Sequence, residues 1–138
     1  MLDHKAWLAK ALGDLRSAKK LAKDDDDTLD TSAYHTQQCA EKALKAYLVF
    51  KNQAVPRTHD LEKLLELCAS LEPSCKILLS DALDLLPYAI YSRYPDDRFD
   101  VSRVEVLSAI KKAAKILNFV KNLIEPEKAL NKTIFNQN

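Results

Sequence analysis

The sequence predicts an all-α protein, folded as an antiparallel up-and-down four-helix bundle with an additional short helix. The first observation behind this prediction is that apolar residues recur three and four positions apart along most of the chain, which places them on one face of a helix. The second is composition, because the 138 residues include a single glycine and many Leu, Ala, Lys and Glu, which lose little side-chain freedom in helices. The third is that the connections between periodic segments are short, so successive helices are expected to be neighbours.

The composition also excludes several classes of protein. Lys and Arg number 21 against 20 Asp and Glu, so the net charge of +1 provides no broad basic surface for DNA or an anionic membrane. Because Gly13 is the only glycine, the glycine-rich loops that bind phosphates in many nucleotide-binding folds cannot form. No run approaches the roughly 18 apolar residues that are needed to cross a bilayer.

The three cysteines Cys39, Cys68 and Cys75 are odd in number and have no CxxC spacing. They lie in apolar helical patterns, which favours buried reduced thiols over a zinc site. The N-terminal residues do not resemble a secretion signal, which has a positively charged start and an apolar core. We therefore expect a cytoplasmic protein without a metal site and without membrane contact.

The first helix is predicted over Asp3–Lys23, where one stripe of apolar residues faces a core. Residues 24–31 lack this periodicity and are interpreted as a solvated loop. A second helix is predicted from Ala33 to about Lys51, with Thr31 or Ser32 as its N-terminal cap.

A short third helix is predicted after Pro56, capped by Thr58 and carrying four apolar residues at helical spacing. A fourth helix is predicted from Ser74. Pro87 lies within it and should interrupt its last turns, because proline has no N–H and its ring collides with the preceding turn.

Ser102 and Glu105 have the spacing of a capping box and are predicted to open the fifth helix. Pro126 should end this helix. We therefore predict one bundle domain over residues 1–125 and a polar tail over residues 126–138. The apolar stripe of the fifth helix is the most regular in the sequence and consists of Val106, Ile110, Ala113, Leu117, Val120 and Ile124.

Three segments are more specific than a helical bundle requires. They are Tyr34–Leu48, His59–Leu61 and Tyr91–Asp96. In the first segment, Gln38, Glu41 and Lys45 are three and four residues apart and share one helix face. In this order and at this spacing, the segments resemble the HEPN family, the higher-eukaryote and prokaryote nucleotide-binding domain, over about residues 3–124.

This resemblance implies a small helical bundle that usually forms a homodimer. It also implies a genetic neighbour, a minimal nucleotidyltransferase, with which such proteins form toxin–antitoxin pairs. Other members of the family are nucleotide-binding or ligand-binding modules. No permanent cofactor is therefore expected, and ATP or GTP is the candidate ligand.

Many HEPN proteins are metal-independent ribonucleases whose activity depends on an Arg followed, after four to six residues, by a His. None of the arginines of this sequence has a His at that distance, so no catalytic residue is assigned and a non-catalytic module is the leading hypothesis. Metal-free RNA cleavage needs a base and a cation at the phosphate. A ribonuclease that uses His59 with Arg93 is therefore the alternative, and a structural adaptor is a third hypothesis.

The predicted nucleotide-binding or partner-binding surface comprises Arg93, Tyr94, Glu41, Lys45, His59 and Asp96. Arg93 has the planar fork that binds a phosphate, although it could instead pair with Glu41 or Asp96 to hold its loop. Tyr94 offers a face for base stacking. Asp60, next to His59, is interpreted mainly as a helix cap. The basic residues of the fifth helix leave RNA as an alternative partner.

Overall fold

The computed structural model describes residues 3–24, 26–91 and 101–126, and within these ranges the ordered elements are helical. The elements are α1 (His4–Asp24), the 3₁₀ turn η1 (Asp26–Thr28), α2 (Leu29–Phe50), α3 (Leu61–Leu71), the 3₁₀ segment η2 (Pro73–Leu78), α4 (Leu79–Leu85), α5 (Tyr88–Tyr91) and α6 (Arg103–Ile124). None of the helices in these ranges is long and apolar enough to cross a membrane.

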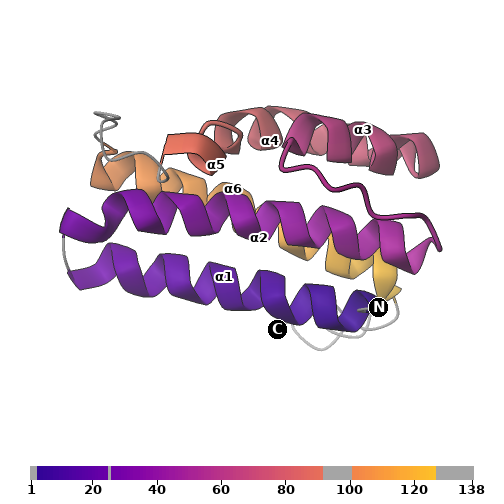
Figure 1. The fold of residues 1–138 in the computed structure, drawn as a ribbon, viewed down its shortest axis with the longest axis horizontal. Helices are drawn as coiled ribbons and strands as arrows, with labels where there is room; N and C mark the ends of the chain where they lie inside the picture. The colour runs from indigo at the N-terminus through magenta and orange to yellow at the C-terminus, as the bar shows by residue number, and fades with distance from the viewer. Residues whose placement is uncertain (1–2, 25, 92–100, 127–138) are drawn as a thin grey trace, which may run out of the picture.

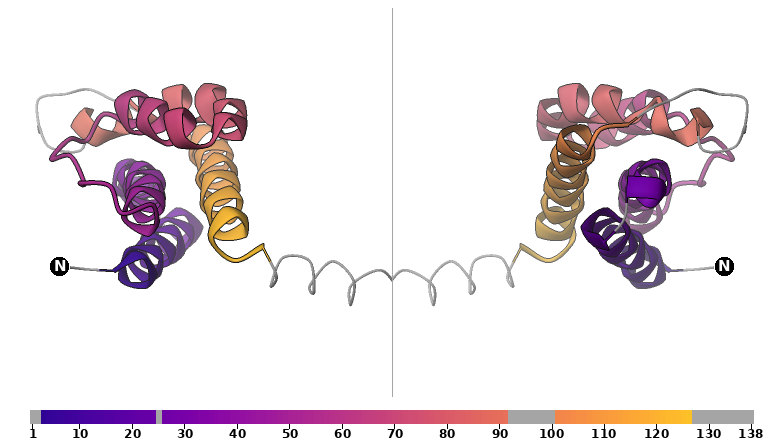
Figure 2. Two further views of the ribbon diagram at one scale, coloured as in Figure 1. Left: turned by 90° about the vertical axis from the view of Figure 1, so that its right-hand side faces the viewer. Right: turned by 90° about the vertical axis from the view of Figure 1, so that its left-hand side faces the viewer.

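The helices form the predicted up-and-down bundle. α1 and α2 lie side by side and antiparallel, and α6 packs behind them in the same direction as α2 (Figure 1). α4 runs in the opposite direction to α2 and α6, while the short α3 is the additional helix. End-on views show α3 and α4 as a layer across α2 and α6 (Figure 2).

The core consists of the inward faces of these helices. α2 is central because it contacts α1, α3, α5 and α6, and most of its residues are buried. All six residues of the predicted stripe of α6 are at most 8% exposed, which confirms the most regular pattern in the sequence. Helical packing of this kind depends mainly on the burial of apolar surface, with each large side chain contributing about 1.5 to 3 kcal/mol.

The start of α2 differs from the prediction. The cap assigned to Thr31 or Ser32 and the long preceding loop are both wrong, because α2 already begins at Leu29. Leu29 is 7% exposed and belongs to the core, so its burial holds an extra helical turn. Ser32 Oγ donates instead to Ala18 O of α1 at 2.6 Å, which joins the two helices.

The start of α3 is capped by Asp60 and not by Thr58. The Asp60 carboxylate accepts from the backbone N–H groups of Glu62 at 3.0 Å and Lys63 at 3.4 Å. Thr58 Oγ1 accepts from Asp60 N at 3.1 Å and therefore stabilises the turn that precedes α3. The interpretation of Asp60 as a cap is confirmed, and the cap assigned to Thr58 is wrong.

The predicted fourth helix is divided into three parts. Its first part is the 3₁₀ segment η2, with Pro73 at its first position, and α4 follows. The helix is then interrupted at Leu86 and Pro87 before α5, which confirms the expected effect of Pro87.

The fifth predicted helix, α6, begins as expected. Glu105 N donates to Ser102 Oγ at 3.1 Å, so Ser102 is the N-terminal cap, and the Glu105 carboxylate accepts from the Ser102 hydroxyl at 3.2 Å. α6 ends at Ile124, two residues before Pro126. The remainder of the predicted tail, residues 127–138, lies outside the described residues.

The cysteines are buried free thiols, as predicted. Burial raises the pKa of Cys39 and of Cys68 to about 12 and that of Cys75 to about 11. The thiols therefore remain protonated at physiological pH. Within the part of the chain that the structure describes, no three His, Cys, Asp or Glu side chains are arranged to hold a metal ion.

Candidate functional site

Three of the six predicted site residues come together in the structure. Glu41 and Lys45 lie on α2, and His59 approaches them from the segment that connects α2 to α3. The other three, Arg93, Tyr94 and Asp96, fall in the range 92–100 and lie outside the described residues.

Glu41 is the centre of this cluster. Its side chain is 5% exposed, and each carboxylate oxygen binds a different basic side chain. Oε2 lies 3.1 Å from Lys45 Nζ, one helical turn away, and Oε1 lies 2.9 Å from His59 Nδ1. Because a buried carboxylate is costly without partners, Lys45 and His59 stabilise its ionised form.

Two glutamines of α2 fix this arrangement. Gln37 is fully buried, and its Nε2 donates to Glu41 Oε1 at 3.3 Å and to the backbone oxygen of His59 at 3.1 Å. Gln38 Nε2 in turn donates to Gln37 Oε1 at 2.7 Å, which orients the Gln37 amide. Gln37 was not among the predicted residues, although its four-residue spacing from Glu41 was the available signal.

A tight turn at the end of α2 directs the chain back toward the cluster. Asn52 has a φ of 58°, in the left-handed region that Asn tolerates better than most residues. Gln53 N donates to Leu48 O and Asn52 N to Val49 O, both at 2.9 Å. This is the Schellman pattern, and it ends the helix and starts the connecting segment.

This turn lines a groove of about 830 Å³. Trp7 of α1 and Lys45 of α2 also line the groove, and Lys45 Nζ lies 5.8 Å from the centroid of the Trp7 ring. The groove is therefore at the end of the bundle where α1 begins and α2 ends (Figure 1). The remaining lining residues are Val49, Asn52, Gln53, Ala54, Val55, Pro56 and Arg57.

The described lining of the groove is basic, aromatic and polar. Lys45 and Arg57 are its cations, and none of the described residues that line it is acidic. The Trp7 ring supplies an aromatic face, and the side chains of Asn52 and Gln53 supply hydrogen-bonding groups. The sequence did not predict Trp7 or Arg57 as site residues, because Trp7 comes near Lys45 through the packing of α1 against α2 and Arg57 follows the turn at Asn52.

A second carboxylate cluster joins α1 to α2. Asp14 Oδ1 lies 2.8 Å from His35 Nδ1, and Asp14 Oδ2 lies 2.6 Å from Lys42 Nζ. The Asp14 side chain is 10% exposed. Thus two carboxylates of this protein each bind one His and one Lys, but the Asp14 cluster lies outside the groove.

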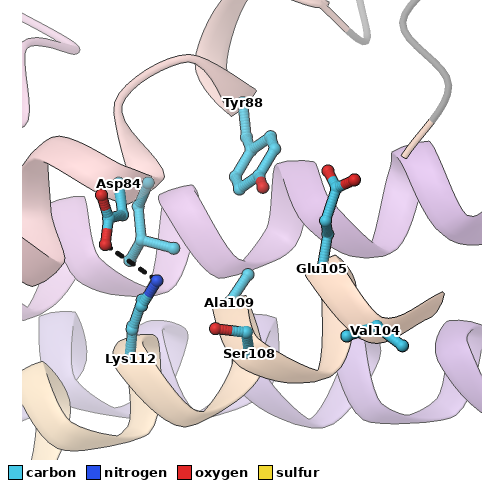
Figure 3. Close-up of a pocket in the computed structure, with 8 residues that line it drawn as sticks. Asp84, Tyr88, Val104, Glu105, Ser108, Ala109 and Lys112 are labelled. Carbon is cyan, nitrogen blue, oxygen red and sulfur yellow. Dashed lines mark ion pairs between the residues drawn. The ribbon is translucent and has the colours of Figure 1, made fainter. Parts of the chain in front are cut away.

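A smaller hollow of about 400 Å³ lies between α4 and α6 (Figure 3). The Tyr88 ring points into it from α5, and Lys112 Nζ pairs with Asp84 Oδ2 at 2.8 Å. Burial, followed by the nearby Glu105 carboxylate, raises the pKa of Tyr88. Two apolar side chains of α6 that flank this hollow are exposed. Val104 is 79% exposed and Leu107 is 48% exposed.

Comparisons with known proteins agree with the observed fold. Residues 4–123 match the model of the HEPN domain. The chain is similar to the crystal structure of ST0689, an archaeal HEPN homologue, with 28% identity and a TM-score of 0.72 over 90% of this chain and 99% of that chain. It is also similar to the crystal structure of TT1696 from Thermus thermophilus, with 30% identity and a TM-score of 0.74 over 88% and 98% of the two chains. No curated protein is a significant match.

Proposed function

The chain belongs to the HEPN domain family, and we propose that it is a non-catalytic module that binds a nucleotide such as ATP or GTP in the groove between Trp7 and Arg57. The observation that carries this proposal is the position of Lys45. Its ammonium group lines the groove, lies beside the aromatic face of Trp7 and is anchored by Glu41.

An ammonium group has three N–H donors, and the anchor to Glu41 uses one of them. Among the described residues, Glu41 is the one hydrogen-bond acceptor observed for Lys45 Nζ, so the other donors can bind a phosphate in the groove, where the exposed Arg57 supplies a second cation. Trp7 lies where a base could stack on its ring, and base–aromatic stacking contributes about 1 to 3 kcal/mol. The groove volume of about 830 Å³ falls in the range of small-molecule sites.

Trp7 is the only tryptophan, so its fluorescence reports directly on this groove. We expect ATP or GTP to change the emission and adenosine, which lacks phosphates, to bind much more weakly. Arg57→Gln should weaken ATP binding about tenfold or more, because a hydrogen bond to a charged group contributes about 1.5 to 3 kcal/mol. Lys111→Gln removes one charge from the exposed face of α6 and serves as the matched control.

No change in Trp7 fluorescence and no heat of binding with either nucleotide would contradict the proposal. Equal weakening by Arg57→Gln and Lys111→Gln would also contradict it, because the binding would then depend only on total charge. Cytoplasmic location remains part of the proposal and is tested by fractionation of the native cells.

We also propose that the protein forms a homodimer and pairs with a minimal nucleotidyltransferase, as the family resemblance implies. Val104 and Leu107 are both exposed and lie three positions apart on one face of α6, and they support an interaction surface there because contiguous exposed apolar side chains mark contact sites. Val104→Glu should then disrupt assembly. A wild-type chain that elutes as a monomer, and separately from the nucleotidyltransferase encoded beside it, contradicts this proposal.

A metal-independent ribonuclease is the second candidate function, and one contact favours it. The Glu41 carboxylate can only accept a hydrogen bond, so His59 Nδ1 is the donor between them. The other ring nitrogen, Nε2, is then the atom that could exchange a proton with a substrate. That is the arrangement of an oriented general base. Purified protein that leaves tRNA and messenger RNA intact at high concentration would exclude this candidate.

The third hypothesis, a structural adaptor, draws support from the completeness of the polar network. In the described ranges, no buried side-chain nitrogen or oxygen lacks a hydrogen-bonding partner. An adaptor predicts that Arg57→Gln and Glu41→Gln change the melting temperature alone, while nucleotide titrations give no signal with any variant.

A further inference from the structure

His59 differs from the other members of the Glu41 cluster because it faces solvent. Its side chain is 56% exposed, whereas the side chains of Glu41 and Lys45 are 5% and 9% exposed. Nδ1 is held by Glu41, so protonation of His59 adds a hydrogen at Nε2 without breaking the existing contact. His59 is therefore the member of the cluster that a proton from solvent reaches most readily.

The charges of the cluster balance when His59 is neutral. Glu41 then carries the negative charge and Lys45 the positive one, and both share a low-exposure environment. A proton on His59 makes the cluster positive, because one carboxylate then serves two cations. Repulsion from Lys45 opposes that proton, and attraction to Glu41 favours it.

The other ionisable groups close to His59 in the chain do not alter this balance on their own. Arg57 lies two residues earlier and adds positive charge at the groove. The Asp60 carboxylate, which also caps α3, carries the charge opposite to that of Arg57, and Glu62 and Lys63 in the first turn of α3 have opposite charges.

An anion in the groove changes this situation. Lys45 lines the groove and is separated from His59 by the Glu41 carboxylate alone, so a phosphate on Lys45 brings negative charge close to His59. Negative charge nearby favours the imidazolium form. Binding and protonation must then strengthen each other by the same factor, because linkage is reciprocal.

We propose that an anionic ligand binds in the Trp7 groove together with a proton that His59 takes up. This inference rests on the proposed nucleotide function and specifies how that site is regulated. It makes the affinity of the groove for phosphate groups increase as the pH falls. The limit is about tenfold per pH unit for one coupled proton.

The test is isothermal titration of the full chain with ATP near pH 7, in buffers that have different heats of ionisation. The dependence of the observed heat on the buffer gives the number of protons taken up. His59→Gln removes the titrating group but keeps a donor for Glu41. His35→Gln removes the corresponding histidine of the Asp14 cluster and is the matched control.

We expect wild type and His35→Gln to take up more protons per ATP than His59→Gln. When the number of protons taken up by His59→Gln is subtracted from the wild-type number, the protons taken up by ATP itself also cancel. Equal proton uptake in all three proteins overturns the inference and leaves nucleotide binding intact, whereas no binding to wild type refutes both. If His59→Gln does not fold, as judged by circular dichroism, the His59 ring is titrated by NMR in the wild type. Saturating ATP must then raise its pKa, and an unchanged pKa overturns the inference.

Discussion

Replacement of Glu41 by Gln tests the energetics of the buried cluster most directly. The substitution keeps the size of the side chain and removes its charge, so the ammonium group of Lys45, on a side chain that is 9% exposed, loses its ion pair. Removal of one partner from a buried pair costs about 3 to 5 kcal/mol. We therefore expect Glu41→Gln to destabilise the protein by that amount.

The double variant Glu41→Gln/Lys45→Met tests whether the loss of stability comes from the unpaired charge of Lys45. It removes both charges, so no uncompensated ammonium group remains, and replacement of both members of a buried pair is often nearly neutral. We expect the double variant to be more stable than Glu41→Gln alone. Asp84→Asn is the control. The Asp84 side chain is 51% exposed and that of its partner Lys112 is 30% exposed, so this ion pair should contribute at most about 1 kcal/mol to stability.

The assay is urea unfolding, followed by the helical circular dichroism signal. With a slope of about 2 kcal/mol per molar urea, a loss of 3 to 5 kcal/mol lowers the midpoint by about 1.5 to 2.5 M. A shift for Glu41→Gln no larger than that for Asp84→Asn would refute the reasoning. Costs that simply add in the double variant would also refute it, since independent residues are additive and coupled residues are not.

Three further predictions follow from the fold. Asp60→Ala should lower the stability by about 1 kcal/mol in thermal or urea unfolding, because α3 loses the cap for two backbone N–H groups. Leu117→Ala should cost about 2 to 5 kcal/mol in the same assay, because the side chain is 1% exposed in the core. Burial raises the pKa of Cys39 and Cys68 from 9.0 to about 12, so the unfolded chain loses these protons first as the pH rises. Stability should therefore fall above pH 9 by about 1.4 kcal/mol per thiol and pH unit. The slope between pH 9 and 10 should be smaller in Cys39→Ala/Cys68→Ala, and an unchanged slope would contradict the assignment.

Local chemistry explains which structural predictions succeeded. The α6 stripe and the Ser102 cap depend on residues within a few positions of one another, and both are confirmed. The cap assigned to Ser32 failed because the hydroxyl binds Ala18 O, 14 residues away in the sequence. A Ser that caps a helix and a Ser that joins two helices are the same in a sequence, and tertiary packing decides between them.

The same distinction applies to the candidate site. The four-residue spacing of Glu41 and Lys45 predicted that they share a face, and the structure confirms their contact. Trp7 and Arg57 come from the two flanking segments, and the groove exists because Asn52 turns the chain back over the end of α2. The spacing pattern predicted Lys45, whereas Trp7 and Arg57 join it through helix packing and through the turn at Asn52, which a spacing pattern does not show.

The two carboxylate clusters provide the means to separate stability from function. Asp14 and Glu41 each bind one His and one Lys, and each has a side chain that is at most 10% exposed. Asp14→Asn and Glu41→Gln should therefore destabilise the fold in a similar way. They differ in their surroundings, because the Glu41 cluster adjoins the groove through Lys45.

Nucleotide titrations of the two variants, below their unfolding temperatures, then discriminate between the hypotheses. A binding module predicts that Glu41→Gln alters ATP affinity and its dependence on pH, whereas Asp14→Asn leaves both unchanged. A structural adaptor predicts the same loss of stability in both variants and no binding in either. Because replacement of both members of a buried ion pair is often nearly neutral, stability alone does not distinguish the two hypotheses, and the nucleotide titration decides between them.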